Sequence, residues 1–85
     1  MTATDKYIKN NIIVQIPRKL DDKREVFAYA AGLFEENRDY TEKEVNEILR
    51  GIYSDHALLR RYLVDFKLLK RNNDGTIYRK MNIKD

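Results

Sequence analysis

Two short amphipathic helices are predicted within residues 41–66, which read TEKEVNEILRGIYSDHALLRRYLVDF. Thr41 is followed three residues later by Glu44, which is the pattern of a capping box at the start of a helix. Apolar side chains then recur with a helical period, as the residues Val45, Ile48, Leu49, Ile52 and Tyr53. The first of the two helices is therefore one-sided, with one face directed to a core.

The second helix begins after Ser54 and Asp55, either of which can cap it. Its apolar side chains repeat the helical spacing, as the residues Leu59, Tyr62, Leu63 and Phe66. Two short helices separated by a tight polar turn are typical of a helix-turn-helix unit.

Downstream, residues 67–71 and 76–81 are β-prone and are joined through Asp74-Gly75, which predicts a hairpin. Upstream, residues 12–16 predict a short strand that Pro17 ends. Asp22 and Glu25 form a capping-box pattern for a core helix running to about residue 36, and residues 38–40 fit a very short strand. Residues 1–10 are predicted to be a mobile tail.

The predicted order of elements is helix, short strand, helix, turn, helix and hairpin. This is the order of a winged helix-turn-helix fold, an α+β architecture with three helices, a C-terminal hairpin as the wing and a short N-terminal strand. With 85 residues, the chain is expected to form one such domain over residues 1–85.

Composition excludes several classes of protein. The chain has no cysteine and one histidine, His56, so a Cys/His zinc site is excluded, and we expect no metal and no cofactor. We find no nucleophile-base set and no glycine-rich phosphate loop, so we expect no enzymatic activity. No apolar run approaches the roughly 20 residues of a membrane span, and nothing resembles a signal peptide, so we expect a cytoplasmic protein without membrane contact.

Charge is distributed unevenly along the chain. Residues 1–55 carry nine Lys/Arg and eleven Asp/Glu, whereas residues 56–85 carry eight Lys/Arg and three Asp/Glu. The C-terminal part therefore has a balance of +5, which favours an anionic partner. An ordinary solvated face would look the same.

The exposed side of the second predicted helix carries side chains suited to a DNA major groove, which are His56, Ala57, Arg60, Arg61 and Val64. Arginine bonds guanine edges, and small apolar groups contact the thymine methyl. Four hairpin cations could bind phosphates, and these are Lys70, Arg71, Arg79 and Lys80. We therefore predict a domain that binds double-stranded DNA.

The segments IPRK (16–19), YTEKEVNEIL (40–49), DHALLRRYLVD (55–65) and DGTIYRK (74–80) resemble a bacterial domain-of-unknown-function family. The resemblance implies a winged-helix-like domain, found alone or fused behind helix-turn-helix domains of transcriptional regulators. It supplies no catalytic residues, and together with the predicted DNA-binding surface it implies a domain of a small bacterial transcriptional regulator. Phe66-Lys67 stands where similar sequences often have an aromatic residue followed by glycine, so a different turn into the hairpin is expected.

The fused members raise an alternative, in which the domain is a protein-interaction or dimerisation module that does not contact DNA. Winged helices serve both uses, and a fold does not determine a function. DNA binding requires the arginines at positions 60 and 61 and the hairpin cations to share one continuous surface. A homodimer would instead expose an apolar patch of several hundred Å² with tyrosines at its rim.

Overall fold

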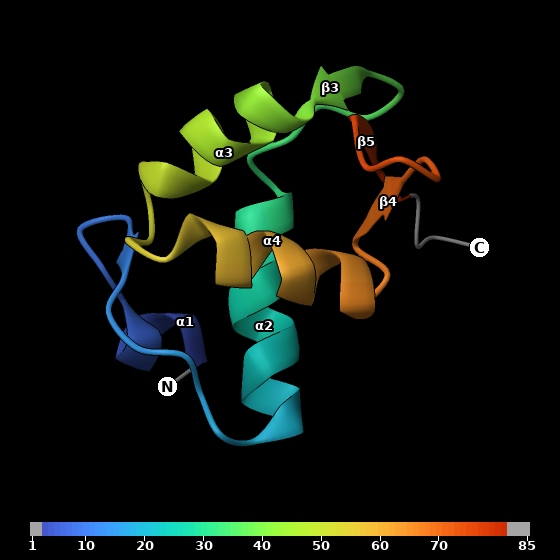
Figure 1. Ribbon diagram of the computed structural model, residues 1–85. Coiled ribbons are helices and arrows are strands. Elements are labelled where there is room, and N and C mark those ends of the chain that lie inside the picture. The colour runs from blue at the N-terminus through green and yellow to red at the C-terminus, as the bar shows by residue number, and fades with distance from the viewer. Residues whose placement is uncertain (1–2, 82–85) are drawn as a thin grey trace.

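The computed structural model describes residues 3–81 and contains, within them, four helices and two small antiparallel sheets (Figure 1). In chain order the elements are α1 (Ala3–Tyr7), β1 (Ile8–Lys9), β2 (Ile12–Ile13), α2 (Leu20–Ala31), β3 (Asp39–Thr41), α3 (Glu42–Arg50), α4 (His56–Asp65), β4 (Leu69–Arg71) and β5 (Ile77–Lys80). The chain is thus a mixed α+β domain, as predicted, but the described residues form four helices instead of the predicted three, because α1 is additional.

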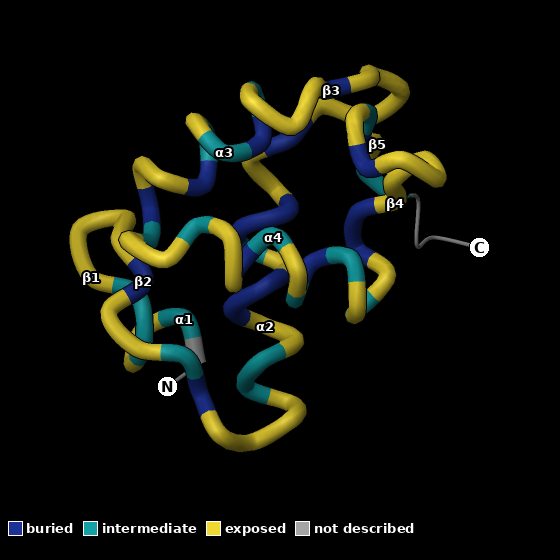
Figure 2. The backbone as a smooth tube through the Cα atoms, in the orientation of Figure 1, coloured by how far each residue is buried: buried dark blue, intermediate teal, exposed yellow. Residues whose placement is uncertain are grey.

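The core lies where α4 crosses α2, and buried segments of the chain converge there (Figure 2). Leu59 and Leu63 are fully buried on α4. The ring of Phe27 on α2 stacks on Tyr62 at 4.9 Å and meets Phe66 edge-on at 5.0 Å. The predicted buried face of α4 is therefore confirmed, with the two aromatic side chains half-buried at its edge.

Local capping signals fix the starts of α3 and α4. The Thr41 amide donates to Oε1 of Glu44 at 2.9 Å, and the Glu44 amide donates to Oγ1 of Thr41 at 3.2 Å, which completes the capping box. Asp55 Oδ1 accepts from the Leu58 amide at 3.1 Å. Both predicted caps are confirmed.

The predicted capping box of α2 is wrong. The helix begins earlier, with Lys19 as its N-cap and without a side-chain cap. Asp21 and Asp22 lie in the first turn instead, where negative charge offsets the positive end of the helix dipole. The helix also ends before residue 36, at Ala31, and the chain then turns through Asn37, whose φ is 58°.

The larger sheet has the strand order β3-β5-β4, so the last strand lies between the other two. Its registers pair Tyr40 with Tyr78 and Arg71 with Tyr78. Gly75 has a φ of 72°, a conformation that glycine adopts without steric cost, at the end of the loop between β4 and β5. The predicted hairpin and the very short strand before α3 are confirmed.

The N-terminal segment differs from the predicted mobile tail. Residues 3–9 form α1 and β1, and Ile8 pairs with Ile13 of β2. The Val14 amide donates to the Tyr7 carbonyl at 2.9 Å, and Tyr7 and Ile8 pack against the core. The predicted strand over residues 12–16 shortens to two residues, because β1 offers it only two partners. Residues 1 and 2 of the predicted tail lie outside the described part of the chain.

Candidate functional site

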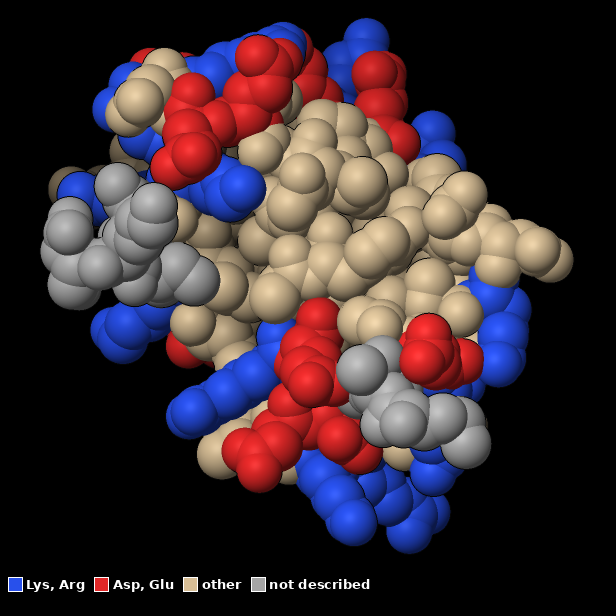
Figure 3. Space-filling model, turned by 180° about the vertical axis from the view of Figure 1, so that it is seen from behind, with Lys and Arg blue, Asp and Glu red and all other residues tan. Residues whose placement is uncertain are grey.

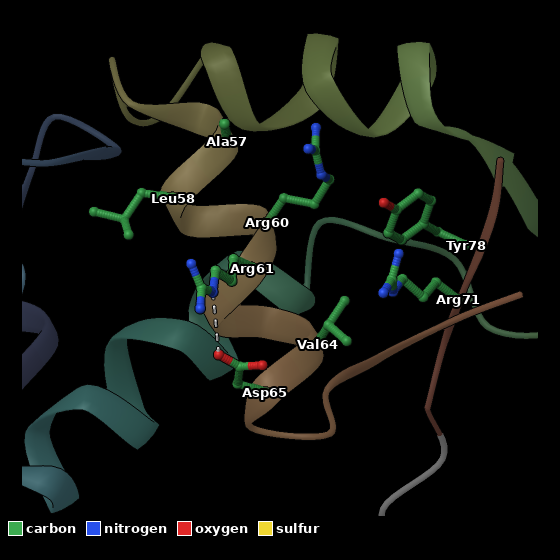
Figure 4. A pocket seen from close by; sticks show the side chains of 8 residues that line it. All are labelled: Ala57, Leu58, Arg60, Arg61, Val64, Asp65, Arg71 and Tyr78. Atoms are coloured by element: carbon green, nitrogen blue, oxygen red, sulfur yellow. Dashed lines mark ion pairs between the residues drawn. The ribbon is translucent and has the colours of Figure 1, made fainter. Parts of the chain in front are cut away.

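A groove runs between α4 and the β4–β5 hairpin (Figure 4). Five of the residues predicted from the sequence line it, and these are Ala57, Arg60, Arg61, Val64 and Arg71. Residues from the two elements meet because the core packs the hairpin beside α4. The fold therefore brings the predicted residues of α4 together with one predicted hairpin cation, Arg71.

Arg61 is highly accessible, with 81% of its side chain exposed. Its Nε lies 3.9 Å from Oδ2 of Asp65, one helical turn further along α4. An ion pair this long and this exposed contributes little free energy. The guanidinium can therefore exchange Asp65 for an external acceptor.

Arg60 is held differently. It is half-buried, and its Nη1 donates to Oδ1 of Asn46 on α3. Figure 4 shows its guanidinium turned toward α3. This bond links α3 to α4 and fixes the direction of the Arg60 side chain along the upper edge of the groove.

On the hairpin, Arg71 and Tyr78 are cross-strand partners and reach toward α4 from the same face of the sheet (Figure 4). Tyr78 is only 3% exposed and lines the groove from within the sheet, whereas its neighbour Arg71 is exposed. A Cβ at Gly75 would lie 3.0 Å from Nη1 of Arg71. The absence of a side chain at this position leaves room for the guanidinium.

The other three hairpin cations do not line the groove. Lys70 and Arg79 are cross-strand partners, each next in sequence to Arg71 or Tyr78. Because successive side chains of a strand point to opposite faces, these two lie on the face of the sheet opposite to Arg71 and Tyr78. The Nε of Arg79 donates to Oδ1 of Asp39 at 2.9 Å. Lys80 pairs with Leu69 and is half-buried. The wing charge is therefore split between two faces.

The tip of the hairpin carries an acidic residue. The Thr76 hydroxyl donates to Oδ1 of Asp74 at 2.7 Å, and the Thr76 amide lies 3.2 Å from the same atom. These bonds hold the pKa of Asp74 below its ordinary value. The hairpin thus has a negative charge at its tip, from Asp74, and a positive charge on the side that faces α4, from Arg71.

His56 does not line the groove either. It is half-buried at the first position of α4, and its Nδ1 is shielded from solvent without a hydrogen-bond partner. Among residues 3–81, no group of three or more His, Cys, Asp or Glu side chains could hold a metal ion. No helix in the same range is long and apolar enough to cross a membrane.

Three groove residues were absent from the predicted site, namely Leu58, Asp65 and Tyr78. Leu58 and Asp65 are three before and four after Arg61, so helical spacing alone places them on its side of α4. Tyr78 carries no comparable signal, because its position depends on the register of the hairpin.

A protein-family model matches most of the chain. Residues 12–80 match the model of a family described as an uncharacterized protein conserved in bacteria (DUF2087). No curated protein matches the chain, and neither does a solved structure.

Proposed function

The chain belongs to this bacterial family, and we propose that it is a winged-helix domain that binds double-stranded DNA in a transcriptional regulator. In this proposal α4 enters the major groove and the β4–β5 hairpin is the wing. The observation that carries it is the shared groove, where Arg60 and Arg61 of α4 and Arg71 of the hairpin lie together.

The roles of the three arginines differ by their surroundings. Arg61 can exchange its weak ion pair with Asp65 for the O6 and N7 of a guanine, and Ala57 and Val64 beside it suit a thymine methyl. Arg71 lies on the hairpin side of the groove and binds a backbone phosphate, and this contact positions the domain without reading the base sequence. Arg60, held by Asn46, adds positive charge at the α3 side and orients the phosphate that lies there.

The test is a fluorescence anisotropy titration of a labelled random duplex with the whole chain at about 150 mM salt. We expect a dissociation constant of about 1–100 µM, the range of sequence-independent binding. The double variant Arg60→Ala/Arg61→Ala should bind about tenfold more weakly, because two cations leave the interface.

The control variant Arg18→Ala/Lys19→Ala removes the same charge from the loop before α2, which does not line the groove. It should bind within about twofold of the wild type, since distant charges are screened at moderate salt. Equal losses in the two variants would show that net charge alone drives binding. No binding by the wild type up to about 100 µM would contradict the proposal.

A protein-interaction or homodimerisation module is the second candidate. The face turned away from the viewer in Figure 1 has a broad uncharged centre bordered by charged side chains (Figure 3). Leu33 is 43% exposed. It lines a shallow hollow with Ile48 and Tyr40, and the other residues that line the hollow are charged, namely Glu35, Arg38, Glu44 and Glu47. Sedimentation equilibrium distinguishes the two candidates. A wild-type dimer that becomes a monomer on Leu33→Asp substitution, in a protein that does not bind duplex, favours the interaction module.

A further inference from the structure

A second groove lies between α2 and the turn that leaves α4. Its walls are mainly apolar, formed by Leu20, Ala28, Phe66 and Leu68. Its volume of about 670 Å³ is within the range of small-molecule sites. The DNA-binding proposal makes no use of this groove.

The apolar walls are both exposed and firmly held. Leu20 is 54% exposed, although it is a large aliphatic side chain in the first turn of a helix. Leu68, at 8% exposure, forms the floor. Phe66 is fixed by its edge-on contact with Phe27 at 5.0 Å. An apolar group entering here would cover Leu20 without a rearrangement of the core.

Two cations stand at the edge of these walls. Arg24 of α2 and Lys67 of the α4–β4 turn both line the groove and are exposed, and neither forms an ion pair within residues 3–81. Asp65 is the acidic lining residue, and its carboxylate faces Arg61 at 3.9 Å. The groove therefore keeps one net positive charge beside an apolar surface.

We infer that this groove binds a small free amphipathic monoanion, such as a medium-chain aliphatic carboxylate. The tail lies between Leu20, Phe66 and Leu68, and the carboxylate lies between Arg24 and Lys67. Each half of the ligand then meets surface of matching chemistry, as in small-molecule sites that combine apolar walls with a few polar anchors. The inference is independent of DNA binding, because the groove shares with the DNA-binding surface only Asp65.

The test uses sodium octanoate as the probe, followed by ¹H–¹⁵N NMR of the whole chain. Amide signals of residues 20–28 and 65–68 should shift with a saturable dependence on octanoate. Acetate has the head group without the tail, and octylamine has the tail with the opposite charge, so both should bind at least about fivefold more weakly. Absence of shifts up to about 10 mM octanoate, or equal binding of octylamine, would overturn the inference.

Two variants locate the site. Arg24→Ala/Lys67→Gly removes both cations, and glycine suits the positive φ of residue 67, so the turn is retained. Its affinity for octanoate should fall about fivefold or more, whereas Lys43→Ala/Lys70→Ala loses the same charge outside the groove and should bind as the wild type does. Leu20→Ser, an exposed position, should weaken octanoate binding but leave the small effect of acetate unchanged. Wild-type affinity in both groove variants would place octanoate elsewhere and overturn the inference.

Discussion

At the scale of single residues, Lys67 occupies a backbone conformation that does not suit lysine. Its φ is 60° in the turn that joins α4 to β4. Glycine adopts this conformation more readily, because a Cβ in this left-handed region costs about 1–2 kcal/mol. Glycine loses more chain entropy on folding, which offsets part of the gain.

We therefore expect Lys67→Gly to raise the free energy of unfolding by about 0.5–1 kcal/mol, measured by urea denaturation. Lys67→Ala is the matched control, since it removes the same charge but keeps the Cβ. Lys67→Ala should not raise the free energy of unfolding by a comparable amount. Equal stabilisation by both variants would attribute the effect to charge and not to backbone strain.

Glu44 makes the stability of α3 depend on pH. Its pKa is lowered because its carboxylate accepts the backbone N–H of Thr41, and Arg38 nearby adds to the effect. A carboxyl whose folded pKa is depressed stabilises the fold above its unfolded pKa, and this contribution is lost as pH falls through the folded pKa.

Glu44→Gln should therefore be less stable than the wild type at pH 7, and the difference should shrink as the pH falls below the ordinary value of 4.5. Thermal unfolding of both proteins between about pH 7 and pH 3 measures this difference. Glu42→Gln is the control, because Glu42 lies in the same turn but outside the capping box. A difference from the wild type that does not vary with pH would contradict the assigned role.

At the scale of elements, α4 is held mainly by its buried leucines. Leu63 is fully buried in the core, so Leu63→Ala should cost about 2–5 kcal/mol, enough to unfold much of a domain of this size. Leu58→Ala makes the same change in the same helix at a side chain that is 37% exposed, and should cost far less. Comparable losses in the two variants, measured by urea denaturation, would mean that the assigned phase of α4 is wrong.

Elements with local signals were predictable from the sequence, and elements held by distant contacts were not. Thr41 and Asp55 bond amides three residues away, so their sequence patterns are sufficient. The start of α2 has no such bond, since Lys19 does not cap it. α1 and β1 depend on tertiary contacts, because Tyr7 and Ile8 pack against the core and the Ile13 amide of the paired strand donates to the Ile52 carbonyl, and a propensity pattern does not contain these contacts.

At the scale of the whole molecule, the candidate site was predictable on α4 and only partly on the hairpin. Helical spacing gave the exposed side of α4, because the period of a helix is fixed. The faces of the hairpin depend on its register, and a shift of one residue exchanges them. Arg71 therefore faces α4 while its neighbour Lys70 does not, although the two look equivalent in the sequence.

This difference between neighbours allows the proposed orientation on DNA to be tested through salt dependence. Each phosphate contact contributes a slope of about −0.9 to the plot of log K against log salt concentration. If Arg71 binds a phosphate in the duplex complex, Arg71→Ala should flatten the slope by about 0.9. Lys70→Ala removes the same charge from the opposite face of the sheet, so the slope should stay at the wild-type value.

Anisotropy titrations of one duplex at several salt concentrations between about 50 and 200 mM measure both slopes. The pair is matched, because the two variants have the same net charge, are changed in the same strand and retain Tyr78 and Gly75. A long-range effect of net charge would change both slopes equally, whereas a direct contact changes one. If Lys70→Ala flattens the slope and Arg71→Ala does not, the duplex lies against the outer face of the sheet and the groove beside α4 is not its binding surface.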